Sequence, residues 1–299
     1  MKDYIVFSIS SNKQTAKDFA RFWNCPLGKI DTFKFVDDED LFVCDADVSG
    51  KDVLIIESTA KKPDEKIVGI LKLLDSVNKC EAKSITLIIP YLGYSAPVID
   101  DKHHTNGAQV MAKILETGRY DKLITIDLYN DKVSKYFSKE IKNIHATKLF
   151  ASYYSNYLKE NGYSNKDVVV VSIDNHCAFE ADQLLFSLRG NKRIVCEKIK
   201  SEKDNAESLR LVEDVKDKIC IVFDDVISSG NIVACAVRLL IKKGAKAVLV
   251  GATHGLFAPG SLDLIKKAGA KEIVITNTVE QKYDGVKVLD ILPIIIDNI

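Results

Sequence analysis

Residues 221–231 read Ile-Val-Phe-Asp-Asp-Val-Ile-Ser-Ser-Gly-Asn, and this stretch decides the class of fold. We expect an apolar strand to end at Phe223, where the carboxylates of Asp224 and Asp225 follow. A loop of small residues then leads into the helical pattern of Asn231–Lys243. A strand that runs through a short loop into a helix is half of a βαβ unit, so the stretch predicts a parallel sheet.

The loop at 228–231 has the chemistry of an anion-binding site. Its backbone N–H groups and the start of the following helix attract negative charge. Asp224 and Asp225 would repel a bare phosphate, so they suit ribose hydroxyls or a bound Mg²⁺ instead. The alternative at this point is an ordinary turn in which Asp and Ser side chains cap the helix.

The same alternation of strand and helix continues over almost the whole chain. Several of the apolar runs are uninterrupted, which is typical of strands covered by helices on both faces. Candidate strands lie at Tyr4–Ser8, Val53–Glu57, Ser84–Ile89, Lys122–Asp127, Asp167–Ser172, Arg193–Glu197, Lys218–Phe223, Ala247–Gly251 and Glu272–Thr276. Candidate helices lie at Lys13–Trp23, Asp64–Val77, Ala108–Glu116, Ala146–Lys159, Ala178–Leu188, Asn231–Lys243 and Leu262–Lys267. The pattern predicts an α/β fold built from parallel sheets.

The length of 299 residues corresponds to about two domains. No proline-rich or low-complexity linker marks the boundary, which we place near 144–147. The sequence therefore predicts a first domain at 1–145 and a second at 146–285, each with its own sheet. The C-terminal segment at 286–299 has an apolar face, and we expect it to pack back on one of the domains.

Composition excludes several classes of protein. With 46% apolar residues and a formal net charge of zero, the chain is neither a disordered protein nor a general nucleic-acid binder. No run of about 18 apolar residues occurs, and the N-terminus lacks the apolar core of a signal peptide, so we expect neither a membrane span nor secretion. The seven cysteines are widely spaced without a Cys-x-x-Cys pair, which favours reduced thiols in a cytoplasmic protein.

The stretch at 221–231 resembles the phosphoribosyl-pyrophosphate loop shared by type I phosphoribosyltransferases and ribose-phosphate pyrophosphokinases. Further stretches resemble the pyrophosphokinases, in the same order along the chain. In the second half these are Ala-Thr-His-Gly-Leu-Phe at 252–257 and Thr-Asn-Thr-Val at 276–279. In the first half they are Phe-Val-Asp-Asp-Glu at 35–39, Ile-Pro-Tyr-Leu-Gly-Tyr at 89–94, Thr-Ile-Asp-Leu at 125–128 and Asn-Ile-His-Ala-Thr at 143–147. The resemblance implies two similar phosphoribosyltransferase-like domains, each a mainly parallel sheet flanked by helices.

The resemblance also implies an activity. Enzymes of this family transfer the diphosphoryl group of ATP to the 1-hydroxyl of ribose 5-phosphate, giving phosphoribosyl pyrophosphate and AMP for nucleotide biosynthesis. This chemistry depends on positioning and charge neutralisation more than on covalent catalysis. Mg²⁺ as the cofactor and assembly into a homo-oligomer, a dimer or a hexamer, are implied in the same way. The nucleotide is expected on the first domain and the ribose phosphate on the second.

The site residues are carried over from the family by matching positions. Lys198 and Lys200 stand at the catalytic loop, where Lys200 replaces an Arg, and Asp174 stands at a metal ligand. Asn231 is expected to cap the helix as well as to bind substrate. The implied nucleotide-binding residues are Phe35, Asp37 and Glu39. The implied ribose 5-phosphate-binding residues are Asp224, Asp225, Ser228, Ser229, Gly230 and Asn231.

Some family positions are changed in this chain, which leaves three interpretations. The first is an active ribose-phosphate pyrophosphokinase. The second is a catalytically impaired paralogue that serves as a regulatory or assembly subunit. The third is a phosphoribosyltransferase, which the matches in the first half disfavour. The changed positions are Ser95 for an Arg that faces the nucleotide, Tyr129 for a metal-binding His, His176 and Cys177 for two glycines, and Ile232 for a Thr.

Overall fold

The computed structural model describes residues 3–95, 103–173, 177–200, 207–211 and 213–299. They form two compact units, each of which is described by itself. The first unit consists of Met1–Ile144 with Thr278–Glu280 and Leu292–Ile299, and the second of His145–Asn277 with Gln281–Ile291. The chain therefore leaves the first unit at the position where we placed the boundary. It then returns to that unit twice, and the segment at 286–299 is divided between the two units.

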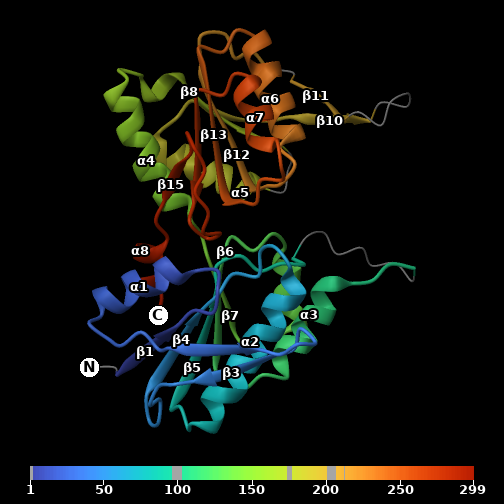
Figure 1. Ribbon diagram of the computed structural model, residues 1–299. Helices are drawn as coiled ribbons and strands as arrows, with labels where there is room; N and C mark the ends of the chain where they lie inside the picture. The colour runs from blue at the N-terminus through green and yellow to red at the C-terminus, as the bar shows by residue number, and fades with distance from the viewer. Residues whose placement is uncertain (1–2, 96–102, 174–176, 201–206, 212) are drawn as a thin grey trace. The chain divides into compact units, whose positions relative to one another are not determined.

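The first unit contains a five-stranded parallel sheet in the order β1-β4-β5-β6-β7. Its strands are β1 (Tyr4–Phe7), β4 (Asp52–Ile56), β5 (Ser84–Ile89), β6 (Lys122–Ile126) and β7 (Ile141–Ile144). Its helices are α1 (Lys13–Phe22), α2 (Pro63–Lys79), α3 (Gly107–Glu116), the 3-10 helix η1 (Asp131–Tyr136) and α8 (Leu292–Ile296). Figure 1 shows α2 and α3 on one side of this sheet and α1 with α8 on the other. A separate antiparallel hairpin is formed by β2 (Ile30–Lys34) and β3 (Asp40–Cys44).

Burial explains why these segments form strands and helices. β4 reads Asp-Val-Leu-Ile-Ile and is buried throughout, as expected of a central strand covered on both faces. On α2 the buried side chains include Ile67, Ile70 and Leu74, which recur every three to four residues and so lie on one face. They share an apolar core with Val53 and Ile55 of β4. The core of the first unit thus forms between α2 and the sheet.

The second unit contains a six-stranded parallel sheet in the order β15-β14-β13-β12-β8-β9. Its strands are β8 (Val168–Ser172), β9 (Lys192–Val195), β12 (Ile219–Ile227), β13 (Ala247–Gly255), β14 (Glu272–Thr276) and β15 (Lys287–Leu289). Its helices are α4 (Thr147–Glu160), the 3-10 helix η2 (Asn165–Asp167), α5 (Ala178–Leu188), α6 (Asn231–Lys242) and α7 (Ser261–Lys267). In Figure 1, α4 lies on one side of the sheet, and α6 and α7 lie on the other. A second hairpin is formed by β10 (Glu197–Lys200) and β11 (Glu207–Arg210).

Every strand and helix expected from the sequence is present, and the α/β fold with parallel sheets is confirmed. The prediction missed both hairpins and the edge strands β7 and β15. These segments lack continuous apolar runs: β7 reads Ile-Lys-Asn-Ile, and the side chains of β3 alternate between half-buried and exposed. An edge strand needs only one neighbour, so its backbone can pair without a strong signal in the side chains.

Two neighbouring strands end later than the sequence predicted. β12 extends to Ile227 and β13 (Ala247–Gly255) to Gly255, although we expected them to end at Phe223 and Gly251. The parallel ladder continues beyond the apolar run, with Asp224 opposite Ala252 of β13. Backbone pairing does not require apolar side chains, which is why the prediction from hydrophobicity was wrong. As a result, Asp224 and Asp225 lie in a strand and not in the loop that follows it.

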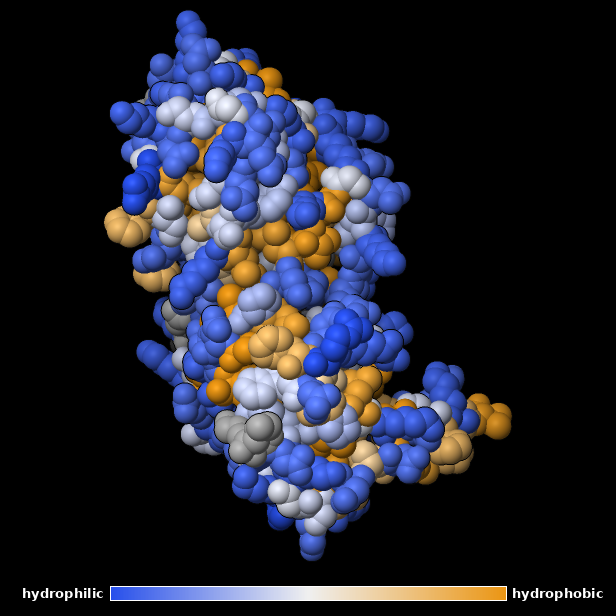
Figure 2. All heavy atoms as spheres, turned by 90° about the vertical axis from the view of Figure 1, so that its left-hand side faces the viewer, coloured by the Kyte–Doolittle hydropathy of each residue, from blue (hydrophilic) through white to orange (hydrophobic). Residues whose placement is uncertain are grey.

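Polar side chains dominate the face of the molecule seen in Figure 2. Figure 2 shows hydrophilic side chains over most of one face, with hydrophobic ones gathered in smaller areas. Exposed apolar side chains occur on the β2–β3 hairpin, at Phe33, Phe35, Val36 and Leu41. Within the described part of the chain, no helix is long and apolar enough to cross a membrane.

Candidate active site

Asp224 and Asp225 lie near the C-terminal end of β12, at the edge of the sheet where ligands bind in parallel α/β folds. Both residues are half-buried. Oδ1 of Asp224 accepts the N–H of Asp225 at 3.0 Å, and Oδ1 of Asp225 accepts the N–H of Val226 at 2.7 Å. The backbone therefore orients both carboxylates. Carboxylate oxygens accept hydrogen bonds from sugar hydroxyls and are also the ligands that Mg²⁺ prefers.

Cys177 contacts this pair from the chain that follows β8. It directly precedes α5, and its Sγ donates a hydrogen bond to Oδ1 of Asp224 at 3.2 Å. Burial, together with the charges of Asp224 and Asp225, raises the pKa of the Cys177 thiol far above its ordinary value, so the thiol stays protonated and can donate. Ligand atoms of the three residues lie within 4.8 Å of one another. A cysteine binds a metal ion as the thiolate, so the two carboxylates are the metal-binding groups of this cluster while the thiol is protonated.

The loop after β12 leaves the start of α6 accessible to a ligand. Ser228 and Ser229 are exposed, and Gly230 is the N-cap residue with a φ of +73°. A Cβ on Gly230 would lie 3.1 Å from the carbonyl oxygen of Ser261, so both the backbone conformation and the close approach favour glycine. Our expectation that Asn231 caps the helix is wrong, because Asn231 is the first residue of α6. The N-cap glycine has no side chain that could cap the helix, and the Oγ of Ser229 accepts the N–H of Asn231 in a long hydrogen bond of 3.4 Å. An anion bound at the loop can accept the first N–H groups of such a helix.

Lys198 and Lys200, implied as catalytic, lie on β10. We expected a loop to begin there, whereas the backbone pairs with β11 in a short hairpin, with Lys198 opposite Leu209. The side chains of both lysines fall outside what the structure describes. The implied metal ligand Asp174 and the neighbouring His176 also lie outside the described residues.

Phe35, Asp37 and Glu39, implied in nucleotide binding, lie together in the turn between β2 and β3. The N–H of Phe35 donates to the carbonyl oxygen of Glu39 at 2.8 Å, and the N–H of Glu39 donates to Oδ1 of Asp37 at 3.3 Å. Asp38 has a φ of +66°, in the left-handed region that glycine adopts most readily and Asp tolerates. Phe35 is 54% exposed, so its ring is accessible for stacking on a base.

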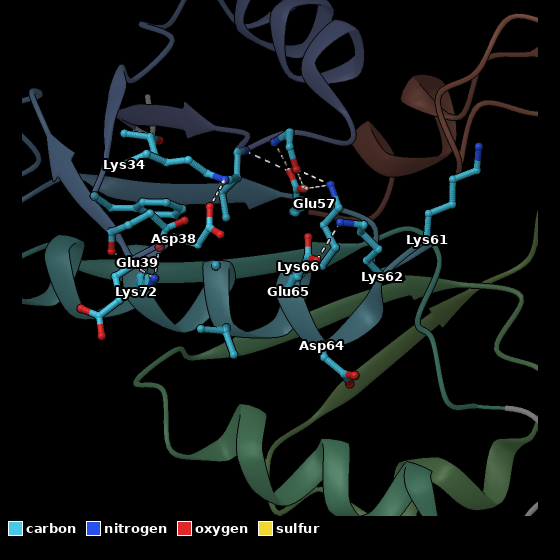
Figure 3. Close-up of a pocket in the computed structure, with 17 residues that line it drawn as sticks. Lys34, Asp38, Glu39, Glu57, Lys61, Lys62, Asp64, Glu65, Lys66 and Lys72 are labelled. Atoms are coloured by element: carbon cyan, nitrogen blue, oxygen red, sulfur yellow. Dashed lines mark hydrogen bonds and ion pairs between the residues drawn. The ribbon is translucent and has the colours of Figure 1, made fainter. Parts of the chain in front are cut away.

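An open groove of about 1370 Å³ lies beside this turn, between the hairpin and α2. Figure 3 shows Asp38 and Glu39 in one part of the groove and Glu57 with Lys66 in another. Its charged lining residues are of both signs: Lys34, Lys61, Lys62, Lys66 and Lys72, with Asp38, Glu39, Asp40, Glu57, Asp64 and Glu65. Charges of both signs do not by themselves mark the groove as a phosphate site, and the clearest candidate for the ribose 5-phosphate is the start of α6.

Comparison with known proteins assigns the family. Residues 4–118 match the N-terminal domain of ribose phosphate pyrophosphokinase, and residues 189–299 match the phosphoribosyl synthetase-associated domain. Over 291 residues the chain is 29% identical to the ribose-phosphate pyrophosphokinase of Fusobacterium nucleatum, covering 96% of this chain and 90% of the relative. The chain belongs to the ribose-phosphate pyrophosphokinase family. A ribose-phosphate pyrophosphokinase of Campylobacter jejuni is 28% identical over 299 residues, which cover 98% of this chain and 94% of the relative.

A solved structure supports the same assignment. The phosphoribosylpyrophosphate synthetase of Mycobacterium smegmatis matches with a TM-score of 0.87 at 27% identity, covering 99% of this chain and 97% of that one. The family and the fold class expected from the sequence are confirmed, and so is membership of a family of enzymes. Because the likeness extends over both units, the interpretation as a phosphoribosyltransferase is not favoured.

One changed family position is explained by its surroundings. Ser95, where the resemblance implied an Arg, is buried, and its hydroxyl donates to the carbonyl oxygen of Leu92 at 2.7 Å. A side chain used in this way stabilises its own loop and supplies no positive charge. Tyr129, where the resemblance implied a metal-binding His, is half-buried directly beyond the end of β6.

Sequence reasoning missed Glu57, which lies directly after β4. Its side chain is fully buried, and its carboxylate accepts the N–H groups of Ile9, Ser10 and Ser11, each at 2.9 Å. Lys66 lies 3.4 Å away. The sequence did contain a signal for this residue, namely a charged side chain at the end of an apolar strand. A carboxylate buried at such a position needs hydrogen-bond donors from other parts of the chain.

Proposed function

We propose that this ribose-phosphate pyrophosphokinase transfers diphosphate from ATP to the 1-hydroxyl of ribose 5-phosphate, with the sugar phosphate bound in the second unit. The observation that carries the proposal is the placement of Asp224 and Asp225 in β12, one short loop before the glycine-capped start of α6. The carboxylates accept the ribose hydroxyls, and the N–H groups of 228–231 bind the 5-phosphate. Substrate is thereby oriented with its 1-hydroxyl exposed for transfer.

The proposal extends to the nucleotide and to Mg²⁺. Phe35, Asp37 and Glu39 bind the nucleotide, and Lys198 with Lys200 neutralises charge on the transferred group. Asp174 is the proposed Mg²⁺ ligand, and Mg²⁺, when bound, supplies charge neutralisation on the phosphates. The oxygen-rich edge of the sheet at Asp224 and Asp225 fits the preference of Mg²⁺ for carboxylates. We also propose that the protein assembles into a homo-oligomer and is located in the cytoplasm.

The test is an assay of the purified protein with ATP, Mg²⁺ and ribose 5-phosphate, in which AMP and phosphoribosyl pyrophosphate are both quantified. Calorimetric titration with each substrate accompanies it. We expect AMP and product in equal amounts, and a fall of about a hundredfold or more in kcat/KM for Asp224→Asn. Asp217→Asn is the matched control, because Asp217 is an exposed turn residue with a φ of +58°, which Asn adopts readily.

Other outcomes would point elsewhere. Binding of ribose 5-phosphate without formation of AMP would favour the catalytically impaired paralogue. Unchanged turnover in Asp224→Asn would show that the sugar phosphate binds at another place.

A further inference from the structure

We propose that Cys177 is a positioning residue, whose thiol holds the carboxylate of Asp224 in the orientation that binds ribose 5-phosphate. The inference rests on the proposed function, because it assigns Asp224 to the sugar. It adds a role for a side chain that the proposed function leaves unused.

The fold brings the two side chains together. β8 and β12 are neighbours in the parallel sheet, with Ser172 opposite Phe223, so both strands reach the same edge. The chain that leaves β8 enters α5 at Ala178, and Cys177 immediately before it lies against Asp224. Cys177 is 4% exposed, so the surrounding protein holds the sulfur in place beside the carboxylate.

Two donors act on the same oxygen of Asp224. Oδ1 accepts the thiol of Cys177 at 3.2 Å and the N–H of Asp225 at 3.0 Å. Hydrogen bonds from these two donors restrict rotation of the carboxylate about its last side-chain bond. A carboxylate that is already oriented loses less conformational entropy when it accepts the sugar hydroxyls, and this favours binding.

Protonation of the thiol is a requirement of this arrangement. A thiolate beside Asp224 would repel the carboxylate and could not donate. Among the residues that the structure describes, the carboxylate of Asp225 also faces the sulfur and disfavours the thiolate further. Burial of Cys177 and the neighbouring carboxylates raise the pKa of the thiol, which favours the donating form.

The experiment compares Cys177→Ala, Cys177→Gly and Cys177→Ser with the unmodified protein. In the Ala and Gly variants we expect the KM and the Kd for ribose 5-phosphate to rise about fivefold, because one hydrogen bond to the carboxylate is lost. The kcat should stay within about twofold of the unmodified protein. Ser retains a donor and should restore most of the affinity. Cys220→Ala is the matched control, since Cys220 is fully buried in the same strand as Asp224 and packs in the apolar core.

A substrate-free measurement tests the contact itself. The infrared S–H stretching band of Cys177, identified by the difference from Cys177→Ala, should shift when Asp224 is changed to Asn. The inference is overturned if that band does not move, or if Cys177→Gly binds ribose 5-phosphate as tightly as the unmodified protein. If the unmodified protein binds no ribose 5-phosphate while the band does shift, the proposed function is wrong, and with it the role of the contact in substrate binding.

Discussion

The carboxylate of Glu280 accepts the backbone N–H of Thr15 at 2.7 Å and the hydroxyl of the same residue at 3.0 Å. Its other oxygen accepts the N–H of Gln14 at 3.2 Å. α1 begins at Lys13, and the side chain of its N-cap residue, Asn12, accepts the N–H of Ser58 instead of capping the helix. A residue near the end of the chain therefore caps the first helix, and its negative charge faces the positive end of the helix dipole.

Replacing Glu280 by Ala should destabilise the first unit. The first turn of α1 would lose both its cap and a favourable charge, at a cost of about 1–2 kcal/mol in the free energy of unfolding. Unfolding in urea, followed by circular dichroism, measures the change. Glu140→Ala, at an exposed position of the same unit, is the control and should have little effect. Equal losses in the two variants would contradict the capping role.

Gly230→Ala should cost more stability than Gly162→Ala. Both glycines have a positive φ, +73° and +65°, so both variants strain the backbone by about 1 kcal/mol. Only at Gly230 would the new methyl group meet other atoms, with Ile265 and Ser261 each at 3.1 Å, whereas nothing lies within 4 Å at Gly162. The free energy of unfolding of both variants checks this, and a similar loss at the two positions would exclude the steric contribution.

Lys198→Ala should remove most of the turnover. If Lys198 neutralises the transferred diphosphate, its loss lowers kcat by about a hundredfold or more. Lys159→Ala, at the exposed end of α4, serves as a control for the loss of one positive charge. AMP formation under saturating substrates measures the effect. Full ATP consumption in Lys198→Ala would mean that the catalytic loop is wrongly assigned.

The ion pair between Asp167 and Lys218 should stabilise the folded protein at neutral pH but not in acid. Lys218 donates to Oδ1 of Asp167 at 2.9 Å, and this hydrogen bond lowers the pKa of Asp167 below its ordinary value of 3.8. Because the folded-state pKa is the lower one, the contribution is present above pH 3.8 and is lost as the pH falls through the lowered pKa.

The measurement for this pair is the stability of Asp167→Asn against pH. The variant should be less stable than the unmodified protein at neutral pH, and the difference should disappear in acid. The effect will be small, since both side chains are partly exposed and the pair is screened by salt. Asp284→Asn, also exposed, should show no such pH dependence. A difference that persists at low pH would rule out the ion pair as its cause.

Glu57→Ala should be among the most destabilising single changes in the first unit. It leaves the N–H groups of Ile9, Ser10 and Ser11 without the carboxylate they share, and we expect a loss of about 3 kcal/mol or more. Glu57→Gln keeps one acceptor oxygen and should lose less. Urea unfolding of the two variants tests the order, and a smaller loss for Ala than for Gln would contradict it.

Local patterns in the sequence were sufficient for the framework of the fold. Buried strands such as β4 and β8 are continuous apolar runs, and helices such as α2 repeat their apolar residues with helical period. The candidate ribose-phosphate residues from Asp224 to Asn231 and the turn at Phe35–Glu39 were proposed through the resemblance to the family, which contiguous stretches of sequence can carry.

The chain's own sequence thus determined the α/β class, the order of its main elements and the contiguous parts of the candidate site. The tertiary structure alone decided the contacts between distant residues: the thiol of Cys177 on Asp224, Glu280 on Thr15, and Glu57 among the N–H groups that follow β1. It also decided the extent of β12 and the edge strands. The physical reason is that apolar periodicity reports which side chains are buried, whereas a hydrogen-bond partner depends on which strands become neighbours once the sheet has formed.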